Sequence, residues 1–226
     1  MTEWRLACLD MAGTTIRDEG LVEQAFTVAF AGQGVAPGTQ EHERMLAWVR
    51  KTMGQSRIEV FRMLLDGDER RAQAANETFE EAYRLLVDEG AVLPIPGAIE
   101  AIKALRHAGV KVALTTGFAR ATQEAIVSAL GWWSEIELVL SPADVGRGRP
   151  FPDLVLVAAH RLGVDDVGQV AVVGDTPLDL IAGKRAGAGL LIGVLTGAGD
   201  RPALRAAGAT QVIGSLGELP RLLKIE

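Results

Sequence analysis

A carboxylate with chemically useful neighbours lies near the start of the chain. Asp10 directly follows the apolar run Leu6–Leu9 and precedes a glycine, Gly13, and two hydroxyl residues, Thr14 and Thr15. Because open parallel sheets bind ligands beyond the carboxyl ends of their strands, an aspartate in this position can meet a ligand. Its carboxylate could ligate a hard cation or attack an electrophile. The alternative interpretation is a strand end followed by a polar turn.

Polar side chains also end apolar runs further along the chain. Thr115 ends one run and Asp175 another, with Asp179 one helical turn further on. Carboxylates at one edge of a sheet repel each other unless a cation joins them, which favours Mg²⁺. Arg149, in a glycine-rich stretch, adds a fixed cation. A transferring phosphoryl group needs a hydroxyl, a cation and backbone N–H groups around its oxygens. The set therefore favours phosphoryl transfer over a series of unrelated helix caps and surface charges.

The hydrophobic pattern shows which elements position these residues. From about residue 95 the chain alternates between strand and helix periods, which is typical of βαβ units and of a parallel sheet covered on both faces. We therefore predict an α/β fold. The expected strands are 6–9, 110–114, 136–140, 170–173, 190–194 and 212–213, and the expected helices are 97–107, 119–130, 153–162, 178–186 and one at the C-terminus. The glycine-rich stretch 193–199 lacks a following Lys-Ser/Thr pair, so we interpret it as a strand end and loop.

Residues 17–93 break this alternation. They contain successive helical patterns at 22–31, 43–50, 57–65 and 70–86, with no convincing strand between them. Polar, glycine and proline residues at 17–20 and 94–97 are typical of hinge connections. We therefore predict a core of residues 1–16 and 94–226 and an all-helical cap of residues 17–93. A cap inserted there would cover the site and exclude water when it closes.

Composition narrows the class of protein. The formal net charge of -6, without a block rich in Lys or Arg, argues against nucleic acid as a partner. The single cysteine, Cys8, cannot form an intrachain disulfide, and its place in an apolar run indicates a small buried hydrophobe in a reducing compartment. No apolar run reaches the roughly 18 residues of a membrane span, and no signal peptide is recognisable. We expect a cytoplasmic protein that acts on a small molecule, without a membrane partner.

The order of the motifs resembles the haloacid dehalogenase superfamily over the whole chain. The residues that carry the resemblance are Asp10, Thr115, Arg149, Asp175 and Asp179. The resemblance implies a Rossmann-like core with a helical cap inserted after the first motif. It makes Asp10 the nucleophile that forms an aspartyl-phosphate, with Thr115 on the phosphoryl group and Arg149 in place of the usual lysine or arginine. Further phosphate contacts are expected from Gly13, Thr14, Thr116 and Gly117.

The same resemblance implies a magnesium site. Asp10 and Asp175 would ligate Mg²⁺, with Asp179 as a further ligand or directly beside one. The backbone carbonyl of Ala12 would complete the protein ligands. The chain is thus expected to be a Mg²⁺-dependent phosphohydrolase for a small phosphorylated or phosphonylated metabolite.

One departure from the superfamily narrows the resemblance. Most of its phosphatases and phosphomutases have a second aspartate two positions after the nucleophile, which protonates the leaving group. Here that position is Ala12, so the chain lacks the general acid that usually raises the reaction rate by roughly 10²–10⁴-fold. The sequence Asp-x-Ala-Gly-Thr-Thr resembles the phosphonoacetaldehyde hydrolases (phosphonatases), in which a cap lysine forms a Schiff base with the aldehyde.

The cap lacks that lysine at the matching position. Met53 and Gly54 agree with the phosphonatase pattern, but Arg57 stands where the lysine is expected and Val60 where a histidine is expected. A guanidinium group stays protonated and cannot form an imine. Lys51 is the only lysine of the cap, and we expect it on another helix face. The chain therefore resembles a phosphonatase-like hydrolase, and Met53 and Arg57 are candidate substrate contacts.

Several alternatives stay open. Arg57 could bind a carboxylate or second phosphate of the substrate, or form a surface ion pair with Glu59 or Glu43. The chain could be a true phosphonoacetaldehyde hydrolase, a metal-independent dehalogenase, or a binding or regulatory protein with weak turnover. By analogy with phosphonatase-like relatives, it could be a monomer or a homodimer paired through the caps.

Overall fold

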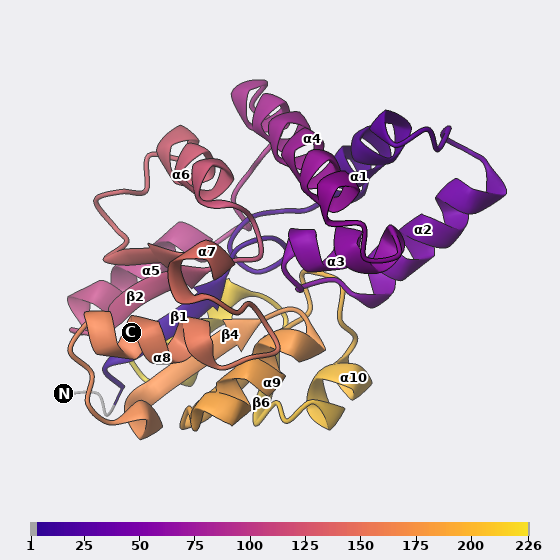
Figure 1. The fold of residues 1–226 in the computed structure, drawn as a ribbon. Coiled ribbons are helices and arrows are strands. Elements are labelled where there is room, and N and C mark those ends of the chain that lie inside the picture. Colours follow the sequence, from indigo (N-terminus) through magenta and orange to yellow (C-terminus); the bar gives the residue numbers. More distant parts are fainter. Residues whose placement is uncertain (1–3, 226) are drawn as a thin grey trace.

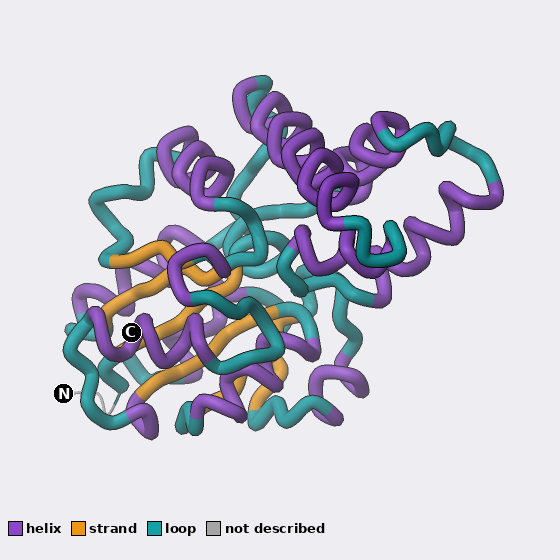
Figure 2. The backbone as a smooth tube through the Cα atoms, in the orientation of Figure 1, coloured by secondary structure: helices purple, strands orange, loops and turns teal. Residues whose placement is uncertain are grey.

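In a computed structural model that describes residues 4–225, six parallel strands form one sheet in the order β3-β2-β1-β4-β5-β6 (Figures 1 and 2). The strands are β1 (Leu6–Asp10), β2 (Lys111–Thr115), β3 (Leu138–Leu140), β4 (Val170–Gly174), β5 (Leu190–Val194) and β6 (Gln211–Ile213). β1 and β4 are neighbours at the centre of the sheet, and the later strands are added on either side of this pair, β2 and β3 beside β1 and β5 and β6 beside β4. Ligands of such sheets bind in the crevice beyond the strands where the order reverses. The predicted α/β parallel sheet is confirmed.

Helices cover the sheet because both of its faces are apolar. Along β1, Leu6 and Cys8 belong to one buried cluster with residues of α8 and α9, whereas Ala7 and Leu9 belong to another with residues of α5. This alternation follows from the two-residue period of a strand. The helices outside residues 17–93 are α5 (Ala98–His107), α6 (Arg120–Ala129), α7 (Pro142–Val145), α8 (Asp153–Arg161), α9 (Pro177–Ala186), α10 (Arg201–Ala206) and α11 (Leu219–Leu222), with 3₁₀ turns at Val167–Gln169 and Leu216–Glu218. Burial raises the pKa of Cys8 to about 12, so its thiol stays protonated.

Residues 17–93 form helices and loops and contain no strand. Its helices are α1 (Leu21–Gly32), α2 (Gln40–Lys51), α3 (Arg57–Leu64) and α4 (Glu69–Asp88). Their apolar faces meet in an aromatic cluster, in which the ring of Phe26 lies 4.7 Å from that of Phe79 and 5.0 Å from that of Phe61. We call this segment the helical insertion. Its core is continuous with the buried cluster between α5 and the sheet.

The two segments that connect the helical insertion to the sheet, residues 15–17 and 93–95, lie side by side next to β1. The backbone N–H of Arg17 donates to the carbonyl of Leu93 at 2.8 Å, and that of Ile95 donates to the carbonyl of Thr15 at 2.9 Å. Figure 1 shows α1–α4 beyond the ends toward which the arrows of β1 and β4 point. The insertion therefore faces the edge of the sheet that carries Asp10.

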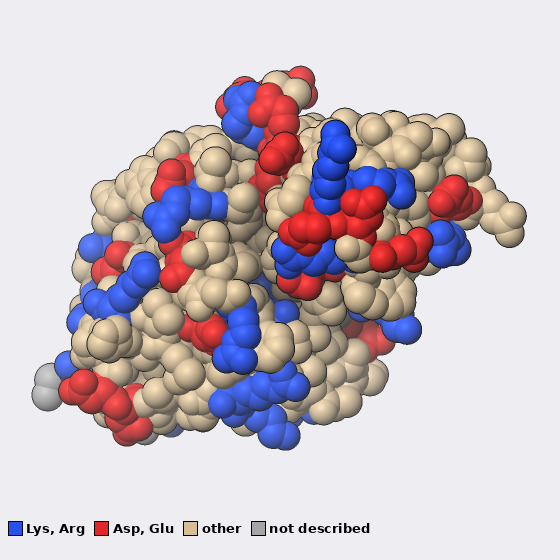
Figure 3. Space-filling view, in the orientation of Figure 1, with Lys and Arg blue, Asp and Glu red and all other residues tan. Residues whose placement is uncertain are grey.

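Charged side chains on the helical insertion are mostly paired. On the face shown in Figure 3, acidic and basic residues are interspersed over α3 and α4, where Arg62 and Arg84 each contact two carboxylates.

Among the described residues, no helix has the length and apolarity needed to cross a membrane.

Candidate active site

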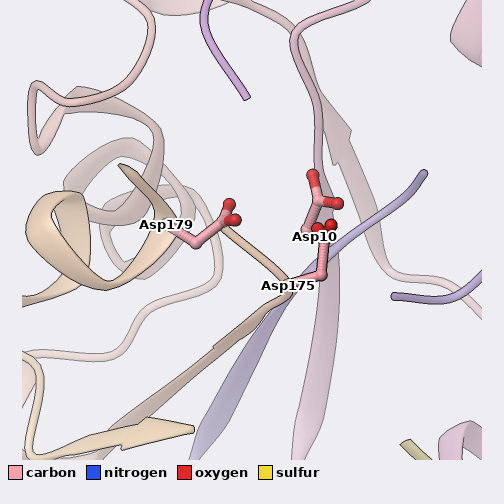
Figure 4. A group of neighbouring side chains, drawn as sticks. All are labelled: Asp10, Asp175 and Asp179. Carbon is pink, nitrogen blue, oxygen red and sulfur yellow. The ribbon is translucent and has the colours of Figure 1, made fainter. Parts of the chain in front are cut away.

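Three carboxylates meet at the carboxyl end of the sheet. Asp10 ends β1 and lies opposite Thr115 at the end of β2, whereas Asp175 directly follows β4 and Asp179 lies in the first turn of α9. The three aspartates each offer an oxygen within 4.8 Å of the others, and all three are buried. In Figure 4, Asp10 and Asp175 lie close together and Asp179 is directed toward them from α9. The structure thus gathers the motifs that the sequence separates by more than a hundred residues.

Arg149 joins the members of this cluster. Its Nη1 lies 2.7 Å from Oδ1 of Asp10, and its Nε lies 2.8 Å from Oδ1 of Asp179. Its Nη2 donates to the hydroxyl of Thr115 at 3.0 Å and to the Thr115 carbonyl at 2.9 Å. Because every nitrogen of this buried guanidinium has a partner, Arg149 is held rigidly beside Asp10.

The charges of the cluster are not balanced by Arg149 alone. Burial raises the pKa of Asp10 to about 6, although Arg149 opposes this shift, and the charge of Asp179 adds to it. Burial also raises the pKa of Asp175 well above its usual value, and the charges of Asp10 and Asp179 reinforce the effect. A buried, oxygen-only donor set with excess negative charge fits a hard divalent cation such as Mg²⁺.

The three carboxylates differ in how free their oxygens are. Oδ1 of Asp179 contacts Arg149, and Oδ2 accepts hydrogen bonds from the backbone N–H of Thr176 at 3.0 Å and its hydroxyl at 2.6 Å. Asp179 thereby caps α9. Asp175 accepts one hydrogen bond on each oxygen, from Thr14 at 3.4 Å and from Ala198 at 2.8 Å, and Asp10 contacts Arg149 through Oδ1. Asp179 has the most partners of the three, so Asp10 and Asp175 are the better candidates for direct metal ligands.

The glycine-rich stretch after β5 supports Asp175. The backbone N–H of Ala198 donates to Oδ2 of Asp175 at 2.8 Å, and the hydroxyl of Thr196 donates to the carbonyl of Gly13 at 2.6 Å. A Cβ on Gly13 would lie 2.6 Å from Asp175 Oδ2, and one on Gly197 only 2.0 Å from the same atom. Both glycines are required because the backbone passes directly over this carboxylate. The stretch is a strand end and loop, but its part in the site has no signal in the sequence beyond the glycines.

A cavity of about 630 Å³ opens between this cluster and the helical insertion. From the sheet side it is lined by Asp10, Ala12, Gly13, Ile95, Thr116, Gly117, Arg149, Asp175, Thr176, Thr196, Gly197 and Ala198, and from the insertion by Arg17, Asp18, Glu19, Gly20, Glu23, Arg50, Met53, Gly54 and Arg57. Three predicted site residues, Thr14, Thr115 and Asp179, lie behind this lining. Thr14 donates its hydroxyl to Oδ1 of Asp175 at 3.4 Å, so it supports a carboxylate.

The loop between α2 and α3, residues 52–56, closes the insertion onto the sheet edge. A Cβ on Gly54 would lie 2.6 Å from the hydroxyl of Thr176, and one on Gly117 would lie 2.6 Å from the carbonyl of Gln55. Both contacts exclude a side chain. The helical insertion and the carboxyl end of the sheet are therefore in close contact at Gly54 and at Gly117, both of which line the cavity.

Comparison with known proteins decides the family. The sequence model of haloacid dehalogenase-like hydrolases matches residues 4–187. The chain belongs to this family. A probable phosphatase IndB of Dickeya dadantii (strain 3937) is 29% identical over 217 residues, which cover 95% of this chain and 91% of the relative. A phosphonoacetaldehyde hydrolase of Bacillus cereus (strain B4264) is 30% identical over 208 residues, which cover 84% and 75%.

Solved structures agree with this placement. A phosphonoacetaldehyde hydrolase-like protein from Oleispira antarctica has a TM-score of 0.83 and 25% identity, covering 98% of this chain and 92% of that one. A hydrolase from Pseudomonas syringae has the same TM-score and identity, covering 98% and 99%. The chain is a hydrolase of the haloacid dehalogenase-like family with phosphonatase-like relatives, as its motifs predict.

The structure corrects one interpretation of Arg57 in this hydrolase. A surface ion pair with Glu59 or Glu43 is wrong, because Arg57 is only 4% exposed and has neither partner. Its Nη1 donates to the carbonyl of Gln55 at 2.8 Å, and its guanidinium lies 4.9 Å from the ring centre of Phe118. The side chain is buried because α3 begins beside the loop that follows β2, where a Cβ on Gly117 would lie 3.1 Å from Nη1 of Arg57.

Lys51 lies on a different helix from Arg57. It is the last residue of α2, whereas Arg57 is the first of α3, so the two side chains belong to separate helices. Its ammonium group lies 5.5 Å from the ring centre of Trp48, and the residue is exposed. Lys51 is absent from the lining of the 630 Å³ cavity, which argues against its replacing the phosphonatase lysine.

Glu80 of the hydrolase connects α4 of the insertion to α6. Its Oε1 accepts the backbone N–H of Ala119 at 3.1 Å, and its Oε2 accepts the hydroxyl of Thr122. A carboxylate from the insertion thus caps the first turn of α6, where backbone N–H groups lack partners.

Replacing Glu80 by alanine is expected to lower the free energy of unfolding by about 3 kcal/mol or more, since it removes two hydrogen bonds to a charged group and each contributes roughly 1.5–3 kcal/mol. Urea unfolding measures this change. Glu81→Ala is the matched control, because Glu81 is an exposed neighbour on α4 that pairs with Arg84 of the same helix. Equal losses in the two variants would show that Glu80 does not hold the insertion to α6.

Proposed function

We propose that this hydrolase uses Mg²⁺ and Asp10 to remove the phosphoryl group of a small metabolite through an aspartyl-phosphate. The observation that carries the proposal is the buried set of Asp10, Asp175 and Asp179 around Arg149, at the sheet edge where the cavity opens. Family membership and relatives named phosphatase and phosphonoacetaldehyde hydrolase support it.

In the first step, a carboxylate oxygen of Asp10 forms a bond to phosphorus while the bond to the leaving group breaks and its electron pair departs with that group. Arg149, 2.7 Å from Asp10, keeps this carboxylate oriented and favours its ionised form. Thr116 and Gly117 line the cavity and would receive phosphoryl oxygens. Water then cleaves the aspartyl-phosphate, which releases phosphate and restores Asp10.

Mg²⁺, held by Asp10, Asp175 and the carbonyl of Ala12, would neutralise negative charge on the transferring phosphoryl group. Asp179 would act mainly by fixing Arg149, since its two oxygens already have three partners, one of them the Arg149 guanidinium. The side chain of Ala12 cannot donate a proton, so the leaving group takes its proton from water or leaves without one. We also propose that residues 17–93 act as the cap that excludes bulk water, and that the enzyme is cytoplasmic.

Phosphate release measured over a panel of small phosphomonoesters and phosphonoacetaldehyde tests the proposal. Removal of divalent metal with a chelator is expected to abolish release, and Mg²⁺ is expected to restore it, because the carboxylates then lack their counter-charge. Asp10→Asn serves as the inactive control.

Two other results would point elsewhere. Faster release from phosphonoacetaldehyde than from every monoester would favour a true phosphonoacetaldehyde hydrolase, despite Arg57. Mg²⁺ binding without release from any compound would favour a binding protein, and release that ignores the chelator would contradict the metal site.

A further inference from the structure

Arg57 differs from the other arginines around the cavity. Within residues 4–225, it forms no ion pair, although it is 4% exposed and lies in the cavity lining. The other three arginines of the lining each have a carboxylate within 3.0 Å: Arg17 with Glu19, Arg50 with Glu23 and Arg149 with Asp10. A buried cation without a paired anion is costly, and ligand-binding sites are where such groups are kept.

The unpaired edge of Arg57 has a defined geometry. Nη1 already donates to the carbonyl of Gln55, whereas the buried Nε has no hydrogen-bond partner among the described residues. Four other arginines of the chain direct Nε and Nη2 together at one carboxylate: Arg50 at Glu23, Arg62 at Glu69, Arg84 at Glu81 and Arg147 at Asp153. The edge left open on Arg57 is this two-pronged edge, whose spacing matches the two oxygens of a carboxylate.

The acidic groups with the largest electrostatic effect on Arg57, Glu80 and Asp18, form no ion pair with it among residues 4–225. Glu80 and Asp18 influence the charge of Arg57 through space, but the oxygens of Glu80 accept from Ala119 and Thr122, and Oδ1 of Asp18 accepts from Val22. The faces of the Phe118 and Phe79 rings cover the guanidinium at 4.9 and 5.8 Å. The cation is therefore sheltered and oriented, while its hydrogen-bonding edge stays unsatisfied.

Arg57 also lies next to the proposed phosphoryl site. A Cβ on Gly117 would lie 3.1 Å from Nη1 of Arg57, and Gly117 follows Thr116 in the loop after β2. A group that reaches Arg57 must therefore be only a few bonds from the phosphorus atom. An aldehyde carbon would find no amine here, since guanidinium does not form imines.

We propose that Arg57 binds a carboxylate of the substrate, which makes the substrate class a small phosphorylated or phosphonylated carboxylic acid. This inference rests on the proposed function, because it assumes that the phosphoryl group lies at Thr116 and Gly117. Nε and Nη2 would donate to the two carboxylate oxygens, which supplies the partner that the buried Nε lacks.

Calorimetric binding of phosphonoacetate and ethylphosphonate to the intact protein with Mg²⁺ tests the proposal. The two ligands differ only in a carboxylate and a methyl group. The unchanged protein is expected to bind phosphonoacetate roughly 10- to 100-fold more tightly, the range of one to two hydrogen bonds to a charged group. Binding needs no turnover, so this test stands even if phosphate release fails.

Three variants assign the preference to Arg57. Arg57→Gln is expected to remove it while leaving ethylphosphonate affinity nearly unchanged, and Arg57→Lys to keep only part of it, since lysine has the charge without the fork. Arg62→Gln, on the same helix but paired with Glu59 and Glu69, should keep the full preference. The proposal is overturned if Arg57→Gln weakens both ligands equally, which would indicate that Arg57 only holds the 52–56 loop, or if the unchanged protein shows no preference.

Discussion

Phosphate release by the Asp10→Asn variant is expected to fall by about 10⁴-fold or more, as loss of the nucleophile does in other enzymes with covalent intermediates. The amide has the shape of the carboxylate and can still meet Arg149, but it is neither charged nor nucleophilic toward phosphorus. The rate at saturating Mg²⁺ measures the effect. Acid quenching followed by mass spectrometry should detect a phosphorylated protein with Asp10 and none in the variant.

Asp88→Asn is the matched control for this substitution. Asp88 lies at the exposed end of α4 and contacts Arg84, so its amide variant should release phosphate at the normal rate. Substantial release by Asp10→Asn, with a normal thermal unfolding midpoint, would exclude Asp10 as the nucleophile. A direct attack of water on phosphorus would then be the better mechanism.

Placing an aspartate at position 12 is expected to have the second-largest effect, in the opposite direction. Ala12 lines the cavity two residues after Asp10, so a carboxylic acid there could protonate a departing oxygen. We expect Ala12→Asp to raise kcat/KM for alkyl phosphates by roughly 10²-fold or more, within the usual range of general acid catalysis. For p-nitrophenyl phosphate, whose leaving group needs no proton, little change is expected. Steady-state kinetics with the two ester types gives the comparison.

Ala12→Asn separates proton donation from size. Asparagine fills the same space but cannot supply a proton in this role, so it should leave the alkyl phosphate rate unchanged or lower it. Equal gains in the aspartate and asparagine variants would mean that filling the space next to Asp10, and not acid catalysis, limits the reaction. No gain in either would indicate that the leaving group is already protonated by another route.

Local patterns along the chain were sufficient to predict the fold. Strands buried on both faces read as short apolar runs, and amphipathic helices repeat every three to four residues, so both elements are visible without tertiary contacts. The predicted strand at 190–194 coincides with β5, and the predicted helix at 153–162 differs from α8 by one residue. The short helices α7 and α10, of four and six residues, escape such reasoning because they are too brief to display a repeat.

The meeting of polar side chains at one edge of the sheet could be predicted for a related reason. Parallel strands bring their carboxyl ends to one edge, so polar residues that end successive apolar runs must meet there. The sequence alone therefore predicts that Asp10, Thr115 and Asp175 lie close together. Their order along the chain also carries the family resemblance, which comparison with known proteins confirms.

The sequence by itself thus determined the α/β sheet, the four-helix insertion and the group of residues at the sheet edge. Only the tertiary structure decided that Arg57 is buried with an open edge, that Ala198 and Gly197 support Asp175, and that Glu80 caps α6. The physical reason is that periodicity and motif order are properties of neighbouring residues. Burial and hydrogen-bond satisfaction depend instead on which distant segments come into contact, and packing of the whole chain decides that.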